Sequence, residues 1–144
     1  MMGLPLLSLI VAAPFVAALI LFVVPGAQRG LVRWISLLGA SVSLAGSVQV
    51  ARVYDLGQGG LQLPERYPLV PSLGIELNMA VDGWGVSLLL LTGIITFAGV
   101  LASWTLKERG KEFFIFLLVL VAGVFGVFVA QDLFVFFLFY EIAV

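Results

Sequence analysis

The chain has 144 residues, of which 62% are hydrophobic and 10% charged, and its mean hydropathy is +1.23. This composition is far from that of soluble globular domains and indicates an integral membrane protein. The net charge of −1 and the scattered basic residues exclude the basic patch that nucleic-acid binding requires. Without cysteine or histidine the chain offers no such ligand to an iron–sulfur cluster, a haem or zinc, so any redox centre is expected in another subunit.

Residues 4–24 predict the first membrane span. At ~1.5 Å per residue this uncharged run reaches about 31 Å, enough to cross a hydrocarbon core of ~30 Å. Pro14 lies mid-run and predicts a kink, which a membrane helix tolerates when a neighbour or water satisfies the freed carbonyl. A cleaved signal peptide is the alternative, but no basic region precedes the run and it is longer than the apolar part of a signal.

Residues 34–51 predict the second span. Gly39, Ser43 and Ser47 recur at every fourth position, so they share one face of the helix. Small residues in this pattern allow another backbone to approach closely. The stripe therefore predicts helix packing, not a substrate site.

A segment rich in glycine and proline follows, and it predicts an extramembrane loop over 54–83. Within it, polar and apolar residues alternate over 75–81, which is typical of a short strand. The chain therefore divides into 1–53 with two spans, the loop 54–83, and 84–144 with the remaining spans.

Residues 84–106 and 113–130 predict the third and fourth spans. Trp84 and Trp104 are about 30 Å apart along a helix, a separation that fits the two interfacial aromatic belts of a bilayer. In the fourth span, a second close-packing face is predicted at Ala122, Gly126 and Ala130.

Gln131 and Asp132 leave room only for a tight turn, and Asp132 is suited to cap a fifth helix. The apolar run 133–144 reaches roughly 18 Å, too short for a span. We therefore expect an all-α, polytopic transmembrane bundle of about five spans with the fifth incomplete, as in a fragment of a longer protein.

The basic residues predict the orientation. Five lie in the first and third connections (Arg29, Arg33, Lys107, Arg109 and Lys111), whereas the second carries Arg52 and Arg66. Because basic residues gather on the cytoplasmic side, the first and third connections are expected there and the N-terminus outside.

Glu141 is a lone carboxylate in the apolar run of the fifth helix. If that helix starts at Asp132 at the membrane edge, Glu141 lies about 13.5 Å inward, near the middle of the core. Burial there favours the neutral carboxyl, so the group is expected to exchange a proton or to pair with a cation on another helix. The alternative is a glutamate that bends toward the headgroups and has no function.

Two stretches resemble a known family. They are Gln131-Asp-Leu-Phe-Val-Phe-Phe-Leu-Phe-Tyr-Glu-Ile-Ala-Val144 and Ala80-Val-Asp-Gly-Trp-Gly-Val-Ser-Leu-Leu-Leu-Leu-Thr92. Both are similar to the N-terminal part of chain M of respiratory NADH–quinone oxidoreductase, an antiporter-like subunit and the counterpart of mitochondrial chain 4. Span order and loop lengths agree over essentially the whole chain.

The resemblance implies a multi-pass, proton-pumping subunit of the bacterial cytoplasmic (inner) membrane, in contact with lipid and with antiporter-like neighbours. Glu141 matches the family's fifth-helix glutamate, whose lysine partner would lie beyond Val144. NADH, FMN, iron–sulfur clusters and quinone would be bound by other subunits, and no cofactor by this chain.

Several alternatives stay open. Mrp-type cation/proton antiporters and related membrane-bound hydrogenases or dehydrogenases share the antiporter-like subunit, and a structural membrane anchor would need no buried charge. Asp82 is a weaker candidate than Glu141, because a turn or a helix cap explains it without function. The hydroxyl of Tyr140 either bonds the Glu141 carboxylate or faces lipid.

Overall fold

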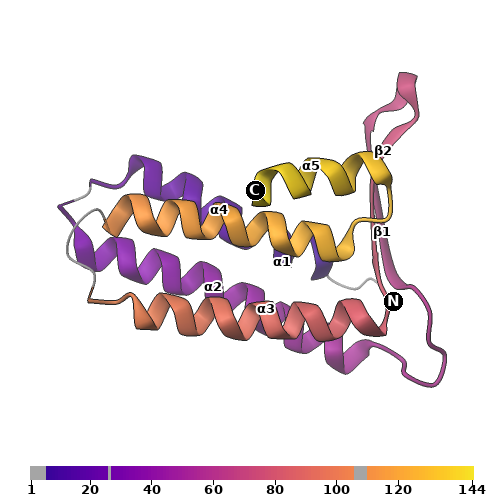
Figure 1. Ribbon diagram of the computed structural model, residues 1–144, viewed down its shortest axis with the longest axis horizontal. Coiled ribbons are helices and arrows are strands. Elements are labelled where there is room, and N and C mark those ends of the chain that lie inside the picture. Colours follow the sequence, from indigo (N-terminus) through magenta and orange to yellow (C-terminus); the bar gives the residue numbers. More distant parts are fainter. Residues whose placement is uncertain (1–5, 26, 106–109) are drawn as a thin grey trace.

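The computed structural model of the protein describes residues 6–25, 27–105 and 110–144. Within these ranges five α-helices form, which are α1 (Leu6–Val23), α2 (Arg29–Val53), α3 (Gly83–Ala102), α4 (Gly110–Val129) and α5 (Leu133–Ala143). Between α2 and α3, the strands β1 (Gln62–Val70) and β2 (Ile75–Val81) form an antiparallel hairpin around the short 3-10 helix η1 (Pro71–Leu73). The helices lie side by side, and the hairpin stands across one end of them (Figure 1).

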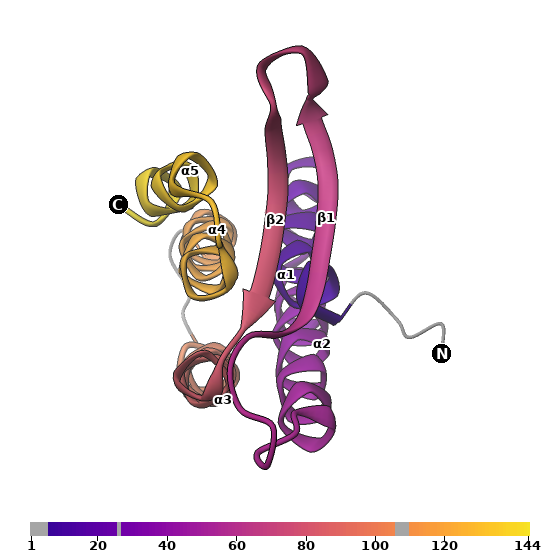
Figure 2. The ribbon, with the colours of Figure 1, turned by 90° about the vertical axis from the view of Figure 1, so that its right-hand side faces the viewer.

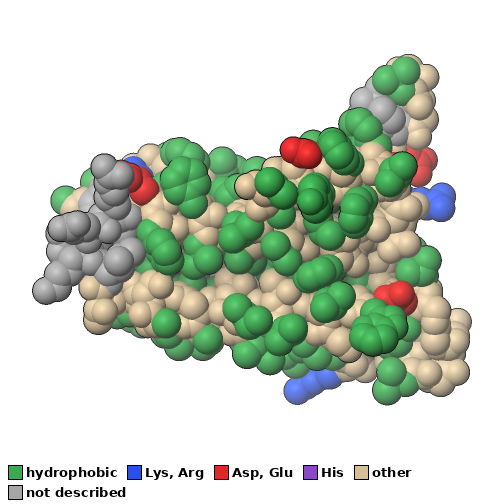
Figure 3. All heavy atoms as spheres, viewed as in Figure 1, with side chains coloured by type: hydrophobic (Ala, Val, Ile, Leu, Met, Phe, Trp, Pro, Cys, Tyr) green, Lys and Arg blue, Asp and Glu red, His purple; other side chains and the backbone are tan. Residues whose placement is uncertain are grey.

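Helices α1 to α4 are long and apolar enough to cross a membrane, which confirms the predicted polytopic helical fold. Large hydrophobic side chains are spread over the face of the bundle seen in Figure 3. Leu38, Ile95 and Phe116 are among the large hydrophobic residues that are exposed. A soluble monomer rarely exposes apolar surface on this scale, whereas lipid covers it at no cost. Helix α5 has 11 residues and reaches roughly 16 Å, too short for a span.

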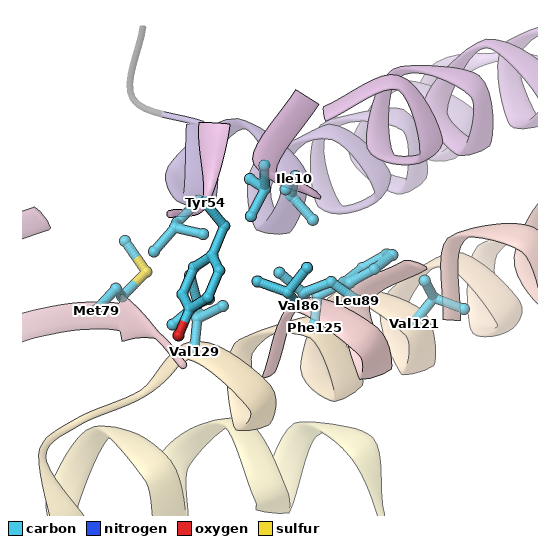
Figure 4. Packing of buried hydrophobic residues seen from close by; sticks show 11 residues of the cluster. Ile10, Tyr54, Met79, Val86, Leu89, Val121, Phe125 and Val129 are labelled. Carbon is cyan, nitrogen blue, oxygen red and sulfur yellow. The ribbon is translucent and has the colours of Figure 1, made fainter. Parts of the chain in front are cut away.

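The helices pack in a defined order around two buried clusters. Helix α1 packs against α2 and α4, α2 also packs against α3, and α4 packs against α5 (Figure 2). One cluster lies beneath the hairpin and includes Tyr54, Met79 and Phe125 (Figure 4). The other lies toward the opposite end and includes Leu21 and Phe114.

The small-residue stripe of α2 packs closely against another helix, as predicted. Gly39 and Ser43 face α1, together with Gly46, which the predicted stripe did not include. A Cβ added at Gly39 would lie 2.8 Å from the Cβ of Ala17, and one at Gly46 would lie 2.7 Å from Cγ1 of Ile10. Ser43, on the same face, is fully buried. Only small side chains therefore permit this approach of the two helices.

Pro14 interrupts the hydrogen bonding of α1, and α2 compensates for it. Proline has no N–H, so the carbonyl of Ile10 four residues earlier loses its donor within the helix. The hydroxyl of Ser43 donates to that carbonyl at 2.9 Å. The group expected to satisfy the freed Ile10 carbonyl is thus the hydroxyl of Ser43, a residue of the packing stripe.

The hairpin contains a strand that the sequence pattern did not predict. β2 occupies the alternating segment, but β1 contains Pro64 and Pro68 and was expected to be loop. Proline is tolerated in an edge strand because no partner needs its N–H. The register shifts between Gln62 and Glu65, so Leu63 and Pro64 form a bulge opposite β2.

Glu65 of β1 caps the start of α1. Its carboxylate accepts hydrogen bonds from the backbone N–H groups of Leu7 at 2.8 Å and Ser8 at 3.2 Å, and from the Ser8 hydroxyl. The first N–H groups of a helix have no partner within it and carry partial positive charge, so a carboxylate there is stabilising. The hairpin is thereby attached to α1.

The two ends of the bundle differ. The α1–α2 and α3–α4 connections share one end, where Trp34 and Trp104 meet edge to face with ring centroids 5.3 Å apart. There, Lys111 donates to the backbone oxygen of Phe22 at 3.3 Å. The hairpin and the start of α3 lie at the other end (Figure 1). Trp84, in the first turn of α3, is exposed. Of the other basic residues on which the orientation rests, Lys107 and Arg109 lie outside the described residues, and the orientation stays a prediction.

Candidate functional site

A tight turn separates α4 from α5. α4 ends at Val129 and α5 starts at Leu133, so the chain reverses within three residues. Asp132 is the N-cap of α5, and its carboxylate accepts from the backbone N–H of Phe134 at 2.8 Å. The predicted hairpin of helices and the predicted cap are both confirmed.

One face of α5 packs against glycines of α4. Val135 is fully buried, and Phe139 and Ala143 follow at intervals of four residues. A Cβ on Gly126 would lie 2.2 Å from Cγ of the Phe139 ring, and a Cβ on Gly123 would lie 2.7 Å from the backbone nitrogen of Ala143. Gly126 belongs to the predicted close-packing face, whereas Gly123 was not predicted.

Glu141 lies on the other face of α5. At 100° per residue it is turned by about 160–200° from Phe139 and Ala143, and it is exposed. Phe134, Phe137 and Leu138 precede it at helical spacing and are exposed as well. The carboxylate therefore ends a stripe of large apolar side chains, about 13.5 Å along the helix from Asp132.

Tyr140, next to Glu141, stacks on the ring of Phe136, with centroids 6.5 Å apart and planes inclined by 15°. The sequence left open whether its hydroxyl bonds the Glu141 carboxylate. Across the described part of the chain, no hydrogen bond joins these two side chains. Stacking on Phe136 accounts for the position of the Tyr140 ring. The Glu141 carboxylate is exposed and accessible to a group on another helix.

The hairpin holds the turn before α5. Ala130 forms an antiparallel bridge with Met79 of β2, and the N–H of Gln131 donates to the oxygen of Asn78 at 2.9 Å. The Gln131 side chain also donates to the oxygen of Ala80 at 3.2 Å. No local pattern could have predicted these contacts, because they join residues about fifty positions apart.

Asp82 serves as a cap. It is the N-cap of α3, and its carboxylate accepts from the N–H of Gly85 at 2.8 Å. This confirms the interpretation of Asp82 as a capping residue. In the described ranges no group of three or more acidic side chains lies close enough together to hold a metal ion.

Comparison with known proteins identifies relatives along nearly the whole chain. NAD(P)H-quinone oxidoreductase chain 4 of a Synechococcus strain is 41% identical over 139 residues, and that of Gloeobacter violaceus is 38% identical over 139 residues. Each alignment covers 96% of this chain and 26% of the relative. This chain is similar to about a quarter of NAD(P)H-quinone oxidoreductase chain 4. That likeness agrees with the resemblance seen in residues 80–92 and 131–144, although these relatives are designated chain 4 and not chain M.

The fold also has a counterpart among solved structures. A chain of the membrane-bound sulfane sulfur reductase, an archaeal respiratory membrane complex, superposes with a TM-score of 0.77 and 24% identity. The match covers 96% of this chain and 21% of that one. No protein-family model matches the chain. The structural likeness supports the helical arrangement and, at this identity, nothing about chemistry.

Proposed function

We propose that the chain is part of the antiporter-like membrane subunit of an NAD(P)H–quinone oxidoreductase, designated chain 4 or chain M. There it would couple electron transfer from the nicotinamide donor to quinone with proton translocation. The observation that carries the proposal is the 41% identity to a chain 4 over 96% of this chain. The four candidate spans and the apolar outer surface agree with such a place in the membrane.

Glu141 is the residue to which we assign the proton path. It lies near the depth of the bilayer centre if Asp132 marks the membrane edge, and an ionisable group at that depth is functional by default. Glu141 is exposed on the face of α5 opposite the one that packs on α4, so a cationic partner on another helix can approach without displacing α5. The family resemblance assigns that partner to a lysine outside this chain.

The redox chemistry belongs to other subunits in this proposal. The chain has no cysteine or histidine to hold an iron–sulfur cluster or a haem. NADH, FMN, the clusters and quinone are therefore assigned to partner chains, and this one to the bacterial cytoplasmic membrane with its N-terminus outside. Electron transfer would act on Glu141 through neighbouring membrane subunits.

Co-purification tests membership of the complex. The full-length protein is tagged in its native membrane, purified in mild detergent and assayed for NAD(P)H–quinone reductase activity. Activity that co-purifies with the tag supports the proposal. Recovery of only small hydrophobic partners, with sodium-dependent proton exchange in vesicles without an electron donor, would contradict it and favour an Mrp-type antiporter.

A further inference from the structure

The α4–α5 turn pairs with the edge of β2 that faces away from β1. Asn78 and Ala80 are two residues apart, so their carbonyls point to the same edge of β2. Gln131 meets both: its backbone N–H donates to Asn78 at 2.9 Å and its side-chain amide donates to Ala80 at 3.2 Å. The bridge between Met79 and Ala130 completes the pairing.

The Gln131 amide satisfies a backbone carbonyl on the edge of β2 that faces away from β1. Ala80 lies opposite the bulge in β1, and its carbonyl, like that of Asn78, points to this outer edge, where β1 offers no donor. Ala80 is nonetheless buried. A buried backbone carbonyl without a donor is costly, so the Gln131 amide has a defined partner there.

β2 offers the turn a rigid support. Met79 and Val81 are each 1% exposed within the cluster beneath the hairpin, and Asp82 directly after β2 caps α3. Through β2, the position of the turn is therefore fixed relative to α3 and to the core, and not only relative to α4. Because Asp132 caps α5 immediately after Gln131, the residue at which α5 begins is set at this point, and the packing of Phe139 on Gly126 then sets which side of the helix faces outward.

We propose that Gln131 is a positioning residue for Glu141. A shift of α5 by one residue at its start would rotate Glu141 by about 100° and carry it along the axis by about 1.5 Å. Such a displacement would misplace the carboxylate relative to a partner on another helix. The inference rests on the proposed function of Glu141.

The test uses membrane vesicles that contain the assembled complex with the full-length subunit. Proton uptake is followed with a pH-sensitive dye and divided by the quinone reduced, with NADPH and NADH each tried as donor. Gln131→Met keeps the length of the side chain and the backbone bond but removes the amide donor. Its ratio of protons to quinone is expected to fall about three- to tenfold, since small misplacements of reacting groups have large effects.

Two variants serve as controls. Gln62→Met breaks side-chain hydrogen bonds at the base of the same hairpin, to Asp55 and Gly59, and leaves the turn intact. Its ratio is expected to stay at the wild-type value. Gln131→Lys retains an N–H donor of similar reach and is expected to keep most of the wild-type ratio, unlike Gln131→Met, which has a similar length and no donor.

The outcomes separate the two proposals. A wild-type ratio in Gln131→Met, alongside a loss in Glu141→Gln, overturns the positioning role and leaves the proposed function standing. Wild-type ratios in both variants overturn the proposed function itself. An equal loss in Gln62→Met also overturns the inference, because general loosening of the hairpin would then suffice. Should Gln131→Met complexes not accumulate, Gln131→Ser, whose hydroxyl cannot reach Ala80, is measured with the same criteria.

Discussion

The α1–α2 and α4–α5 interfaces both depend on small residues, yet they leave their helices in different situations. Between α1 and α2 the stripe includes serine, and the Ser43 hydroxyl donates a hydrogen bond to the Ile10 carbonyl that Pro14 leaves without a donor. Between α4 and α5 the stripe is glycine, and it receives the ring of Phe139. The first interface supplies a hydrogen bond that the backbone of α1 lacks, whereas the second holds α5, whose outer face carries the exposed Glu141.

The two interfaces differ in what they contribute to the protein. Helices α1 and α2 form an internally satisfied pair, in which the polar groups of the packing stripe have partners within the pair. Helix α5 is held on one side by α4 and at its start by β2, and within the described residues its other side is exposed. Substitutions in the first interface should therefore affect stability, and those in the second should affect function as well.

Gly126→Ala should have the largest effect on the second interface. The added Cβ would lie 2.2 Å from Cγ of the Phe139 ring, so α5 must move or the ring must leave its place. Overpacking of this kind costs about 1–3 kcal/mol, and we expect a lower thermal unfolding midpoint together with reduced proton uptake per quinone. Gly99→Ala is the matched control, since a Cβ there meets nothing within 4 Å. Equal behaviour of the two variants would refute the close packing.

Ser43→Ala should affect stability and leave coupling unchanged. Removal of the hydroxyl leaves the Ile10 carbonyl without a donor, at a cost of about 1 kcal/mol. In a Pro14→Ala background the helix supplies its own N–H to Ile10, so the cost of Ser43→Ala should shrink. Unfolding midpoints of the four proteins in this cycle measure the coupling. Strictly additive effects would show that Ser43 does not compensate for Pro14.

Tyr140→Phe should have the smallest effect. The stacking on Phe136 does not need the hydroxyl, and that hydroxyl makes no hydrogen bond to Glu141 within the described chain. We expect wild-type proton uptake and quinone reduction. A clear fall in proton uptake would instead show that the hydroxyl reaches the carboxylate during turnover.

The sequence predicted the parts of the fold that depend on local patterns. Apolar length located the four candidate spans, and Asp82 and Asp132 showed capping chemistry beside the segments that they cap. The spacing of Gly39 and Ser43 showed which face of α2 packs, because four residues return a helix to the same side.

The remaining features depend on long-range contacts. β1 forms despite two prolines because β2 supplies the pairing, and Glu65 caps a helix that starts almost sixty residues earlier. The exposed side of Glu141 follows from where Gly126 receives Phe139, which α5 alone does not encode. Of the candidate site, the carboxylate itself was therefore predictable and its setting was not.

Glu141→Gln tests whether the Glu141 carboxylate lies on the proton path. This substitution keeps the shape of the side chain and removes its ability to ionise. In vesicles with the assembled complex, we expect proton uptake per quinone to fall by about tenfold or more while the complex still assembles. Glu76→Gln, the same change on the hairpin, is the control and should behave as wild type. A Glu141→Gln complex that translocates protons at the wild-type ratio would show that Glu141 does not carry the translocated proton.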